Sequence, residues 1–429
     1  MVLVIDSGTT NTKALLFAAP GKLVGEAYAP TKTRHPGPRR VEQAAEEWWR
    51  AALAATGKLP AEQRTAVQAI VTSTQGGTFA PLDNDLKPLR PGITWLDNRS
   101  ANQAAQLNRR HEKDFFYRRT GHHLLGWTPL SVICWLRKNE PETSRRTTRL
   151  SFVADYLNYK LTGRFFLDQT AAGMSTLFNI NSGDWDADLL KIAGLQSGQL
   201  PDLVPAGVSG GTLSRPAAKI LGLSEGIPVI SGGHDQYCAS LGAGAINPGD
   251  CLLSCGTAWA LLVLTRKPVF KPGSSWTPGR HFQPGTFGLM GAISNGGVVL
   301  DWLRKNLRLQ ASLVNSAPAG DSRVLVTTRF SEGRGSIKNL SLAVESEDIY
   351  YAALKDLARQ VSACLGQLKD AVKLKRIFLV GGGAKEPLLL PIIAHNTKLE
   401  VIAPDINEAA ARGAALLAIK STVKNKTRY

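Results

Sequence analysis

The segment SGGHDQYCAS, residues 231–240, sets an imidazole beside a carboxylate directly after two glycines. Either His234 or Asp235 could accept a proton from a substrate hydroxyl, because both groups are common general bases. The adjacent pair is also compatible with a hydrolase or a metal site. On an extended segment neighbouring side chains point to opposite faces, so we expect only one of the two to face a substrate.

The segment SGTTNTK, residues 7–13, could hold a polyphosphate, although it lacks the G-x-x-x-x-G-K-[ST] spacing of a Walker loop. Its glycine allows backbone N–H groups to approach phosphate oxygens. The hydroxyls of Thr9 and Thr10 and the ammonium of Lys13 supply donors and a positive charge. Asp6, at the end of the preceding apolar run, could hold Mg²⁺ directly or through water. An ordinary polar hairpin tip is the alternative for this segment on its own.

Two later segments carry related features. CLLSCGTAWALLVL, residues 251–264, repeats the design of two apolar runs joined by Gly-Thr, from which we infer an internal duplication. LVGGGAKEP, residues 379–387, places three consecutive glycines between an apolar run and a helix start, where a base or a phosphate can lie against the backbone. Each motif alone is weak evidence for a nucleotide site, but the order and spacing of the motifs along the chain are more specific.

The elements that must position these groups alternate between strands and helices. Hairpins are predicted at 1–17 and 251–264, a strand at 66–74, and helices at 42–56, at 105–118 and in WTPLSVICWLRKNEPE, SFVADYLNYKLTG, VVLDWLRKN, EDIYYAALKDLARQVSACLGQLKD and INEAAARGAALLAIK. This alternation predicts an α/β fold, and 429 residues are too many for a single core. We place the domain boundary near residue 225, which gives domains at 1–225 and 226–429.

The net charge of +17, from 51 Lys and Arg against 34 Asp and Glu, raises nucleic acid as a partner. The basic residues form scattered doublets without a dominant cluster or a nucleic-acid motif, so we disfavour this role. The five scattered cysteines indicate free thiols rather than metal ligands. The N-terminus lacks the basic start of a signal peptide, and no window approaches about 18 uninterrupted apolar residues. We therefore expect a cytoplasmic protein without a membrane partner.

The motifs, taken in order, resemble the FGGY family of carbohydrate kinases over nearly the whole chain. The segments that carry the resemblance are IDSGTTNTK, QGGT with PLRPGITWLDNR, DYLNYKLTGRFFLDQTAAGMST followed by GDWD, GGHDQ, CGTA, GAISNGGVVLDWL, VGGGAKEPLL and EAAARGAALLA. The resemblance implies two ribonuclease H-like domains of the actin-like ATPase type with an interdomain cleft. It also implies that sugar binds in this cleft, that ATP binds mainly to the C-terminal domain, and that Mg²⁺ accompanies ATP.

The resemblance also implies roles for individual residues. Asp235 matches the catalytic base. His234 is then its neighbour, and whether it contacts the sugar is undecided. Asp6 matches the carboxylate associated with Mg²⁺. The positions implied to surround the nucleotide are Thr9, Thr10, Lys13, Gly256, Thr257, Gly297, Gly382 and Gly383. The positions implied to contact the substrate, in addition to Asp235, are Gln75, Gly76, Gly77, Thr78 and Gln236.

The sequence departs from the family pattern in three places. QGGT at residues 75–78 is neither the Arg-Glu pair of glycerol kinases nor the Met-His pair of typical bacterial xylulokinases. Val132 stands where the first signature of the family usually has Lys, and the segment TTRFSEGRGSIKNLSLAVES is short for the family.

The segment with Trp95, Asp97 and Arg99 either shapes the site or provides structural hydrogen bonds beneath it.

The resemblance predicts an enzyme that phosphorylates a hydroxyl of a small ketose or polyol with ATP, with a pentulose such as xylulose first. A glycerol- or erythritol-type polyol kinase is the alternative among enzymes. The departures leave open a catalytically silent sensor of sugar or nucleotide on the same scaffold. A homodimer is compatible with the sequence and is not specified by it.

Overall fold

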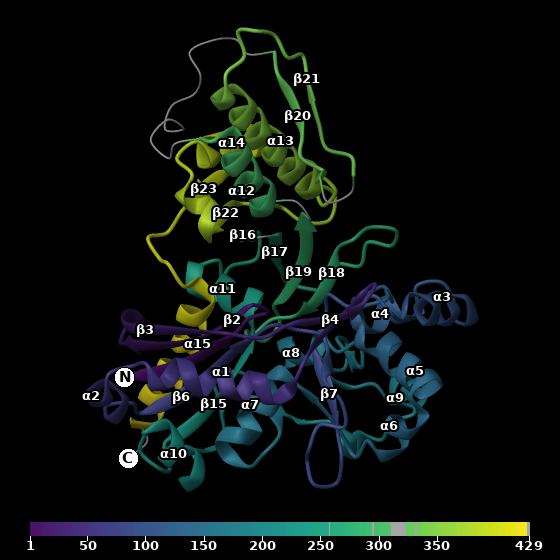
Figure 1. The fold of residues 1–429 in the computed structure, drawn as a ribbon, viewed down its shortest axis with the longest axis vertical. Coiled ribbons are helices and arrows are strands. Elements are labelled where there is room, and N and C mark those ends of the chain that lie inside the picture. The colour runs from purple at the N-terminus through teal and green to yellow at the C-terminus, as the bar shows by residue number, and fades with distance from the viewer. Residues whose placement is uncertain (257, 294–295, 310–322, 331–332, 427–429) are drawn as a thin grey trace. The chain divides into compact units, whose positions relative to one another are not determined.

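The computed structural model describes residues 1–256, 258–293, 296–309, 323–330 and 333–426 (Figure 1). The chain divides into two compact units. The first contains Met1–Gly242, Thr277–Gly285 and Ala410–Tyr429, and the second contains Ala243–Trp276 and Thr286–Ala409. Among the described helices, none combines the length and the apolar character needed to cross a bilayer.

The first unit is built on a six-stranded sheet. Its strand order is β14 (Ser209–Thr212), β15 (Pro228–His234), β6 (Ala69–Thr74), β1 (Val2–Ser7), β2 (Asn11–Ala18) and β3 (Lys22–Pro30). β1 pairs antiparallel with β2 and parallel with β6, and β6 pairs parallel with β15. All six residues of β1 are buried, as expected for a central strand that is covered on both faces.

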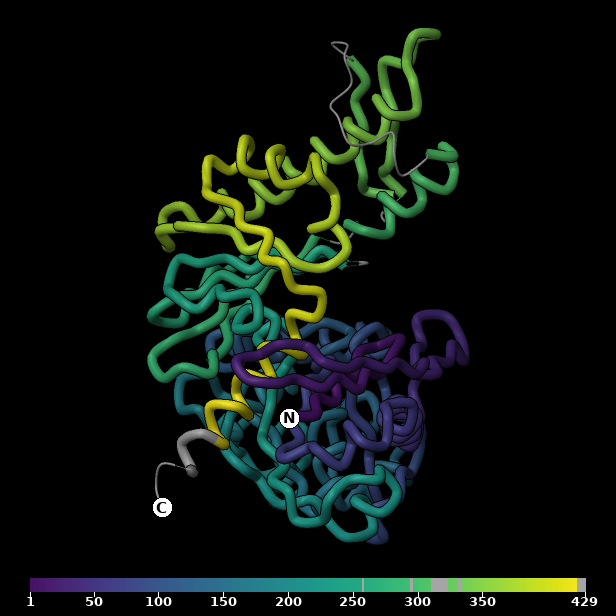
Figure 2. The backbone as a smooth tube through the Cα atoms, turned by 90° about the vertical axis from the view of Figure 1, so that its left-hand side faces the viewer, coloured from purple at the N-terminus to yellow at the C-terminus, as the bar shows by residue number. Residues whose placement is uncertain are grey.

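Helices cover both faces of this sheet. Leu3 and Ile5 of β1 pack with α1 (Ala45–Gly57), α7 (Val153–Thr162) and α10 (Arg215–Leu221). The alternate residues of the same strand, Val2 and Val4, pack with α11 (Asp235–Ala243) and α15 (Ala409–Lys426). Figures 1 and 2 both place the yellow α15 beside the purple N-terminal strands. The C-terminal helix therefore completes the first unit.

A second sheet of the first unit has the order β4 (Arg34–Gly37), β5 (Arg40–Gln43), β8 (Gly92–Ile93), β7 (Phe79–Leu82) and β9 (Arg149–Phe152). The remaining helices of the unit are α2 (Ala61–Thr65), α3 (Ala101–Arg110), α4 (Phe115–Thr120), α5 (Pro129–Asn139), α6 (Pro141–Arg146), α8 (Gln169–Gly173) and α9 (Ala187–Ala193). The short strands are β10 (Phe166–Leu167), β11 (Phe178–Asn179), β12 (Asp184–Trp185), β13 (Asp202–Leu203) and β18 (Thr277–Arg280).

The second unit repeats the strand arrangement of the first. Its strands follow the order β19 (Phe287–Ile293), β17 (Trp259–Thr265), β16 (Asp250–Cys255), β22 (Arg376–Val380) and β23 (Glu400–Ile402). The first two pairings in this order, β19–β17 and β17–β16, are antiparallel, and the last two are parallel, as in β3-β2-β1-β6-β15. The order supports the internal duplication. Helices α12 (Gly296–Leu307), α13 (Ser346–Gly366) and α14 (Leu389–Thr397) and the hairpin β20 (Leu325–Thr327) with β21 (Ser336–Lys338) complete the unit.

The predicted hairpins are confirmed, and two other predictions differ from the structure. The single helix expected at 105–118 is instead α3 and α4, because Asp114 adopts a left-handed φ of 63° between them. The boundary expected near residue 225 differs from the division into units. β15 lies between β14 and β6 inside the first sheet, so residues up to Gly242 belong to the first unit.

Candidate active site

The strand β15 ends at His234 and the helix α11 begins at Asp235. This junction turns the two neighbouring side chains toward each other, with His234 Nε2 at 3.5 Å from Asp235 Oδ1. The expectation that they face opposite sides therefore fails, because the extended segment stops between them. Both groups belong to one site.

Asp235 has the electrostatics of a general base. Burial raises the pKa of its carboxyl to about 6, and hydrogen bonds from the backbone and side chain of Gln236 oppose this rise. The side chain nevertheless keeps 28% of its surface exposed. A carboxylate that is accessible and has a raised pKa is ionised at neutral pH and binds a proton more strongly than an ordinary aspartate.

His234 is buried and neutral, because burial lowers the pKa of its imidazole to about 4. Its backbone N–H donates to Thr170 Oγ1 at 3.0 Å, and the Thr170 hydroxyl donates to Asp168 Oδ1 at 2.9 Å. The Nδ1 atom is enclosed and has no hydrogen-bond partner among the described residues. The histidine is therefore fixed in position by its backbone and by packing.

The turn between β1 and β2 is closed by a hydrogen bond from Gly8 N–H to the carbonyl of Asn11 at 3.0 Å. Asp6 is nearly buried and lies opposite Lys13 in the strand register, while Thr10 is exposed at the tip. Within the described residues, no three His, Cys, Asp or Glu side chains gather as a metal site. A single carboxylate suits Mg²⁺, which commonly takes one or two carboxylates together with water and phosphate oxygens.

The side chain of Gln75 ties the QGGT loop to this turn. Its Oε1 accepts hydrogen bonds from the hydroxyls of Thr9 at 3.1 Å and Thr78 at 3.3 Å. Its Nε2 donates to Gln43 Oε1 at 3.0 Å and to the carbonyl of Gly8 at 3.5 Å. Every hydrogen-bonding position of this buried amide is used within the protein. Its contact with a substrate stays a prediction.

The two glycines of QGGT lie among large side chains. A Cβ atom on Gly76 would lie 2.5 Å from Met174 Cγ and 2.6 Å from His234 Cδ2, so no other residue fits there without displacement. Gly77 has a φ of +74° and lies against Trp95 and Trp127. Sequence reasoning missed Met174 and Trp127, because no local pattern marks a contact between residues so far apart in the chain.

Trp95 contacts the turn between β1 and β2 directly, since its Nε1–H donates to Thr9 Oγ1 at 2.9 Å. Its backbone N–H donates to Thr78 Oγ1 at 3.3 Å. These bonds connect the turn between β1 and β2, the QGGT loop and the segment of Trp95. Of the predicted site residues, the structure thus connects Thr9, Gln75 and Thr78 through hydrogen bonds, and it places His234 against Gly76.

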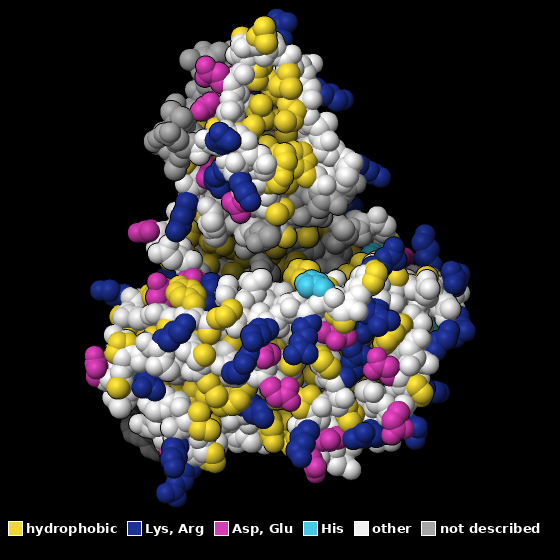
Figure 3. All heavy atoms as spheres, in the orientation of Figure 1, with side chains coloured by type: hydrophobic (Ala, Val, Ile, Leu, Met, Phe, Trp, Pro, Cys, Tyr) yellow, Lys and Arg dark blue, Asp and Glu magenta, His cyan; other side chains and the backbone are white. Residues whose placement is uncertain are grey.

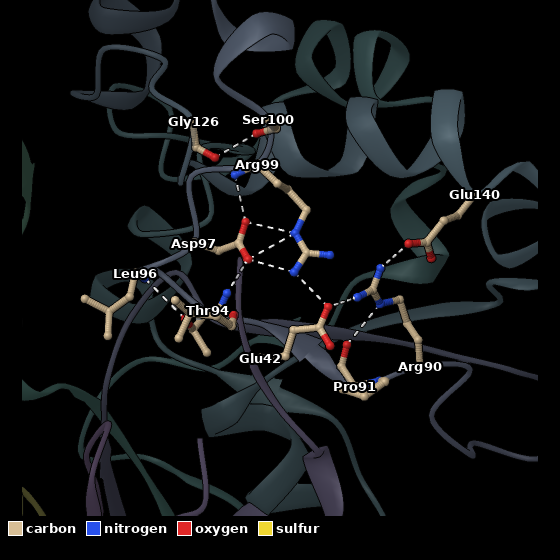
Figure 4. Close-up of polar contacts among 11 residues, drawn as sticks. Glu42, Arg90, Pro91, Thr94, Leu96, Asp97, Arg99, Ser100, Gly126 and Glu140 are labelled. Atoms are coloured by element: carbon tan, nitrogen blue, oxygen red, sulfur yellow. Dashed lines mark hydrogen bonds and ion pairs between the residues drawn. The ribbon is translucent and has the colours of Figure 1, made fainter. Parts of the chain in front are cut away.

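A buried ionic network is centred on Asp97 and Arg99, which follow Trp95 in the chain (Figure 4). Asp97 accepts hydrogen bonds from the backbone N–H of Val41 at 2.6 Å and from the Arg99 side chain at 2.7 to 3.0 Å. Arg99 also donates to Glu42 at 2.7 Å, and Arg90 pairs with Glu42 and Glu140. These contacts favour the structural interpretation of Asp97 and Arg99, which hold the segment that carries Trp95.

The predicted nucleotide positions of the second unit meet around Cys255 and Gly256. The backbone N–H of Gly297, at the start of α12, donates to the carbonyl of Gly256 at 3.1 Å. A Cβ atom on Gly383 would lie 2.5 Å from Cys255 Cβ, and one on Gly382 would lie 3.8 Å from the Cys255 carbonyl oxygen. Thr257 lies outside the described residues. Gly256 and Gly382 are exposed, whereas Gly383 is buried against Cys255. Glycine turns of this kind allow a base or a phosphate to approach the backbone closely.

Comparison with known proteins gives a consistent result. The N-terminal domain model of the FGGY family of carbohydrate kinases matches residues 1–242, and its C-terminal domain model matches residues 251–422. A gluconokinase from Bacillus subtilis is 25% identical over 99% of this chain and 88% of its own length. An L-fuculokinase from Salmonella typhi is 29% identical over 97% of this chain and 91% of its own.

Among solved structures, a xyloylose kinase from Brucella ovis is similar with a TM-score of 0.89 at 26% identity, covering 98% of this chain and 90% of that one. The expected α/β fold of the two-domain, actin-like ATPase type is thereby confirmed.

Proposed function

Because the chain belongs to the FGGY family of carbohydrate kinases, we propose that it transfers the γ-phosphoryl group of ATP to a hydroxyl of a small ketose, with a pentulose such as xylulose as the first candidate. The observation that carries this proposal is the partly exposed Asp235 carboxylate, whose pKa is about 6, at the start of α11. ATP as the donor also leads us to propose a cytoplasmic location.

Asp235 acts as the proton acceptor in this reaction. The sugar hydroxyl donates its proton to the carboxylate while its oxygen forms a bond to the γ-phosphorus, and the bond from this phosphorus to the bridging oxygen of ADP breaks. The products are the sugar phosphate, ADP and one proton. Phosphoryl transfer depends mainly on positioning and on charge neutralisation, so the other residues serve to hold the two reactants.

The chain supplies groups for both parts of ATP. The hydroxyls of Thr9 and Thr10 and the ammonium of Lys13 would bind phosphate oxygens, and Asp6 would hold Mg²⁺. When bound, Mg²⁺ neutralises charge on the phosphate oxygens. The glycine turns around Gly256 would receive the remainder of the nucleotide. The buried position of Asp6 beside a tight turn supports its role.

The surroundings of Gly76 and Gly77 favour a ketose over glycerol. The Arg-Glu pair that glycerol kinases have at these positions is replaced by glycines, and Trp95, Trp127 and Met174 lie against them. Aromatic side chains suit the apolar C–H face of a sugar ring or chain. A polyol kinase of the glycerol or erythritol type is the second candidate, because Gln236 follows the base here as it does in glycerol kinases.

A substrate panel tests the proposal. ADP formation from Mg·ATP would be measured with D-xylulose, D-ribulose, L-fuculose, D-gluconate, erythritol and glycerol. We expect turnover with a ketose at a kcat/KM well above that for glycerol. Turnover with glycerol or erythritol alone would establish the second candidate. Binding of ATP and sugar by calorimetry without turnover of any compound would contradict both and indicate a sensor.

A further inference from the structure

Gln43 is the last residue of β5, and its fully buried side chain forms hydrogen bonds with the turn between β1 and β2 and with the QGGT loop. Its amide nitrogen donates to the Thr9 carbonyl at 2.7 Å and to Thr33 Oγ1 at 3.0 Å. Its amide oxygen accepts from Trp48 Nε1 at 3.0 Å and from Gln75 Nε2 at 3.0 Å. The protein therefore uses all four hydrogen-bonding positions of this amide.

Two of these partners determine which end of the Gln43 amide is the nitrogen. The indole N–H of Trp48 can only donate, and the backbone carbonyl of Thr9 can only accept. The oxygen of Gln43 therefore faces Trp48, and its nitrogen faces Thr9. Because the same oxygen also faces the amide of Gln75, that amide presents its nitrogen there and its own oxygen to the hydroxyls of Thr9 and Thr78.

Gln43, Thr9 and Gln75 form a closed ring of three hydrogen bonds. Gln43 donates to the Thr9 carbonyl, the Thr9 hydroxyl donates to Gln75 Oε1 at 3.1 Å, and Gln75 donates back to Gln43. The bond from Trp48 attaches this ring to α1 in the core of the first unit. The ring connects the turn that the proposed function assigns to the ATP phosphates with the loop that it assigns to the sugar.

On the basis of the proposed function, we propose that Gln43 is a positioning residue, which holds the turn between β1 and β2 with its amide nitrogen and the QGGT loop with its amide oxygen. Phosphoryl transfer depends on the placement of both reactants, and a misplacement of about 1 Å can cost about 10²-fold in rate. Gln43 acts through Thr9 and Gln75, because its own side chain is fully buried. The two ends of its amide should therefore affect the two substrates separately.

Two variants separate the two ends of the amide. Gln43→Met is similar in length and lacks the amide, so the turn and the loop both lose their hydrogen bond to it. Gln43→Glu keeps an oxygen for Trp48 and Gln75 but places a second oxygen against the Thr9 carbonyl, where no N–H remains. Measurement at about pH 8 keeps this carboxylate ionised, since several donors face it.

Calorimetry would give the dissociation constants for Mg·ATP and for the ketose with the highest kcat/KM in the panel. We expect both variants to weaken ATP binding by about tenfold, and only Gln43→Met to weaken sugar binding by a similar factor. The kcat of both variants should fall with the displacement of the turn. Because Gln43→Met adds no charge, its loss of ATP affinity cannot come from repulsion of the phosphates.

Trp48→Phe is the matched control, since it removes one hydrogen bond from the same amide on the side of α1. Its melting temperature should fall, while both dissociation constants and kcat should stay close to the wild-type values. Equal losses of ligand affinity in Trp48→Phe and Gln43→Met would overturn the proposal, because the effect would then be a general loosening of the core.

Unchanged ATP affinity in Gln43→Glu, or an equal loss of sugar affinity in both Gln43 variants, would also overturn the proposal. If Gln43→Met does not fold, Gln43→Glu decides alone, by weaker ATP binding with retained sugar binding. If the wild-type enzyme turns over none of the sugars, the proposed function fails instead. The Mg·ATP dissociation constants of the variants still decide the role of Gln43 in that case.

Discussion

At the scale of single residues, the raised pKa of Asp235 makes its proposed role as the base testable by the pH dependence of the reaction. The carboxylate must be ionised to accept a proton, and its pKa is about 6. We expect kcat to be constant above about pH 7 and to fall about tenfold per unit below about pH 6. A pH profile of kcat with saturating substrates checks this. An activity that stays level down to about pH 5 would exclude Asp235 as the base. Protonation of His234 does not affect this test, because its imidazole stays neutral across this pH range.

Gly76 provides a second test at this scale. In Gly76→Ala the new Cβ atom collides with Met174 and His234, so we expect a loss of about 1–3 kcal/mol in the free energy of unfolding and a higher sugar KM. Gly173→Ala is the matched control, since nothing lies within 4 Å of a Cβ atom at that helical glycine. Urea denaturation of both variants would measure the difference. Equal stabilities would show that the close packing at Gly76 is not as described.

At the scale of elements, local patterns predicted the two hairpins with Gly-Thr turns, the strand of Ala69–Thr74 and the main helices. These follow from apolar periodicity and turn residues that are close in sequence. The partners of Gln75 could not be predicted, because Thr9 and Gln43 are 66 and 32 residues away. The break before α4 also escaped prediction, since it depends on a left-handed backbone at Asp114, which the helical pattern conceals.

The ionic network around Asp97 and Arg99 gives a prediction at the same scale. Arg99→Ala would leave the fully buried Asp97 carboxylate without its cation, for which we expect a loss of about 3–5 kcal/mol in the free energy of unfolding. Arg145→Ala is the control, because Arg145 pairs with Glu142 on the surface and its loss should change stability by about 0–1 kcal/mol. Chemical denaturation compares the two. Similar losses of unfolding free energy in the two variants would mean that the ion pairs of Arg99 do not stabilise the segment of Trp95, Asp97 and Arg99.

At the scale of the whole molecule, the basic residues form no dominant cluster along the sequence. Figure 3 shows Lys and Arg side chains scattered over the visible face and separated by other side chains. This distribution agrees with an excess of 17 positive charges that forms no dominant patch in the sequence. It gives no support to a nucleic-acid role and fits an enzyme that handles anionic nucleotides.

Buried titratable groups of opposite type give a second whole-molecule expectation. Burial lowers the pKa of His122, His234 and His281 to about 4 and raises the pKa of Asp155, Asp168 and Asp235 to about 7, 6 and 6. Between about pH 4 and 6 the unfolded chain binds more protons at the histidines, so stability falls as the pH falls. At the aspartates the unfolded chain binds fewer protons than the folded chain, so the stability that these aspartates contribute falls as the pH rises. We therefore expect the opposite pH dependences of the histidines and the aspartates to cancel, so that the free energy of unfolding stays nearly constant between about pH 4 and 6.

The variant Asp155→Asn removes one of the opposing contributions. We expect its free energy of unfolding to rise with pH between about pH 4 and 6 by about 1.4 kcal/mol per unit relative to the wild type. Far-ultraviolet circular dichroism during urea denaturation at several pH values measures both slopes. Parallel curves for variant and wild type would show that Asp155 titrates alike in the folded and unfolded states.

The central claim is that Asp235 is the base of a sugar kinase, and sugar-dependent ADP formation by wild-type and Asp235→Asn enzyme tests it most directly. The wild type should form ADP only when a ketose is present. The variant keeps the shape of the side chain but loses the proton acceptor, so kcat should fall by about 10²- to 10⁴-fold while calorimetric ATP binding is unchanged. A variant that retains the wild-type kcat, or ADP formation that does not depend on sugar, would contradict the account.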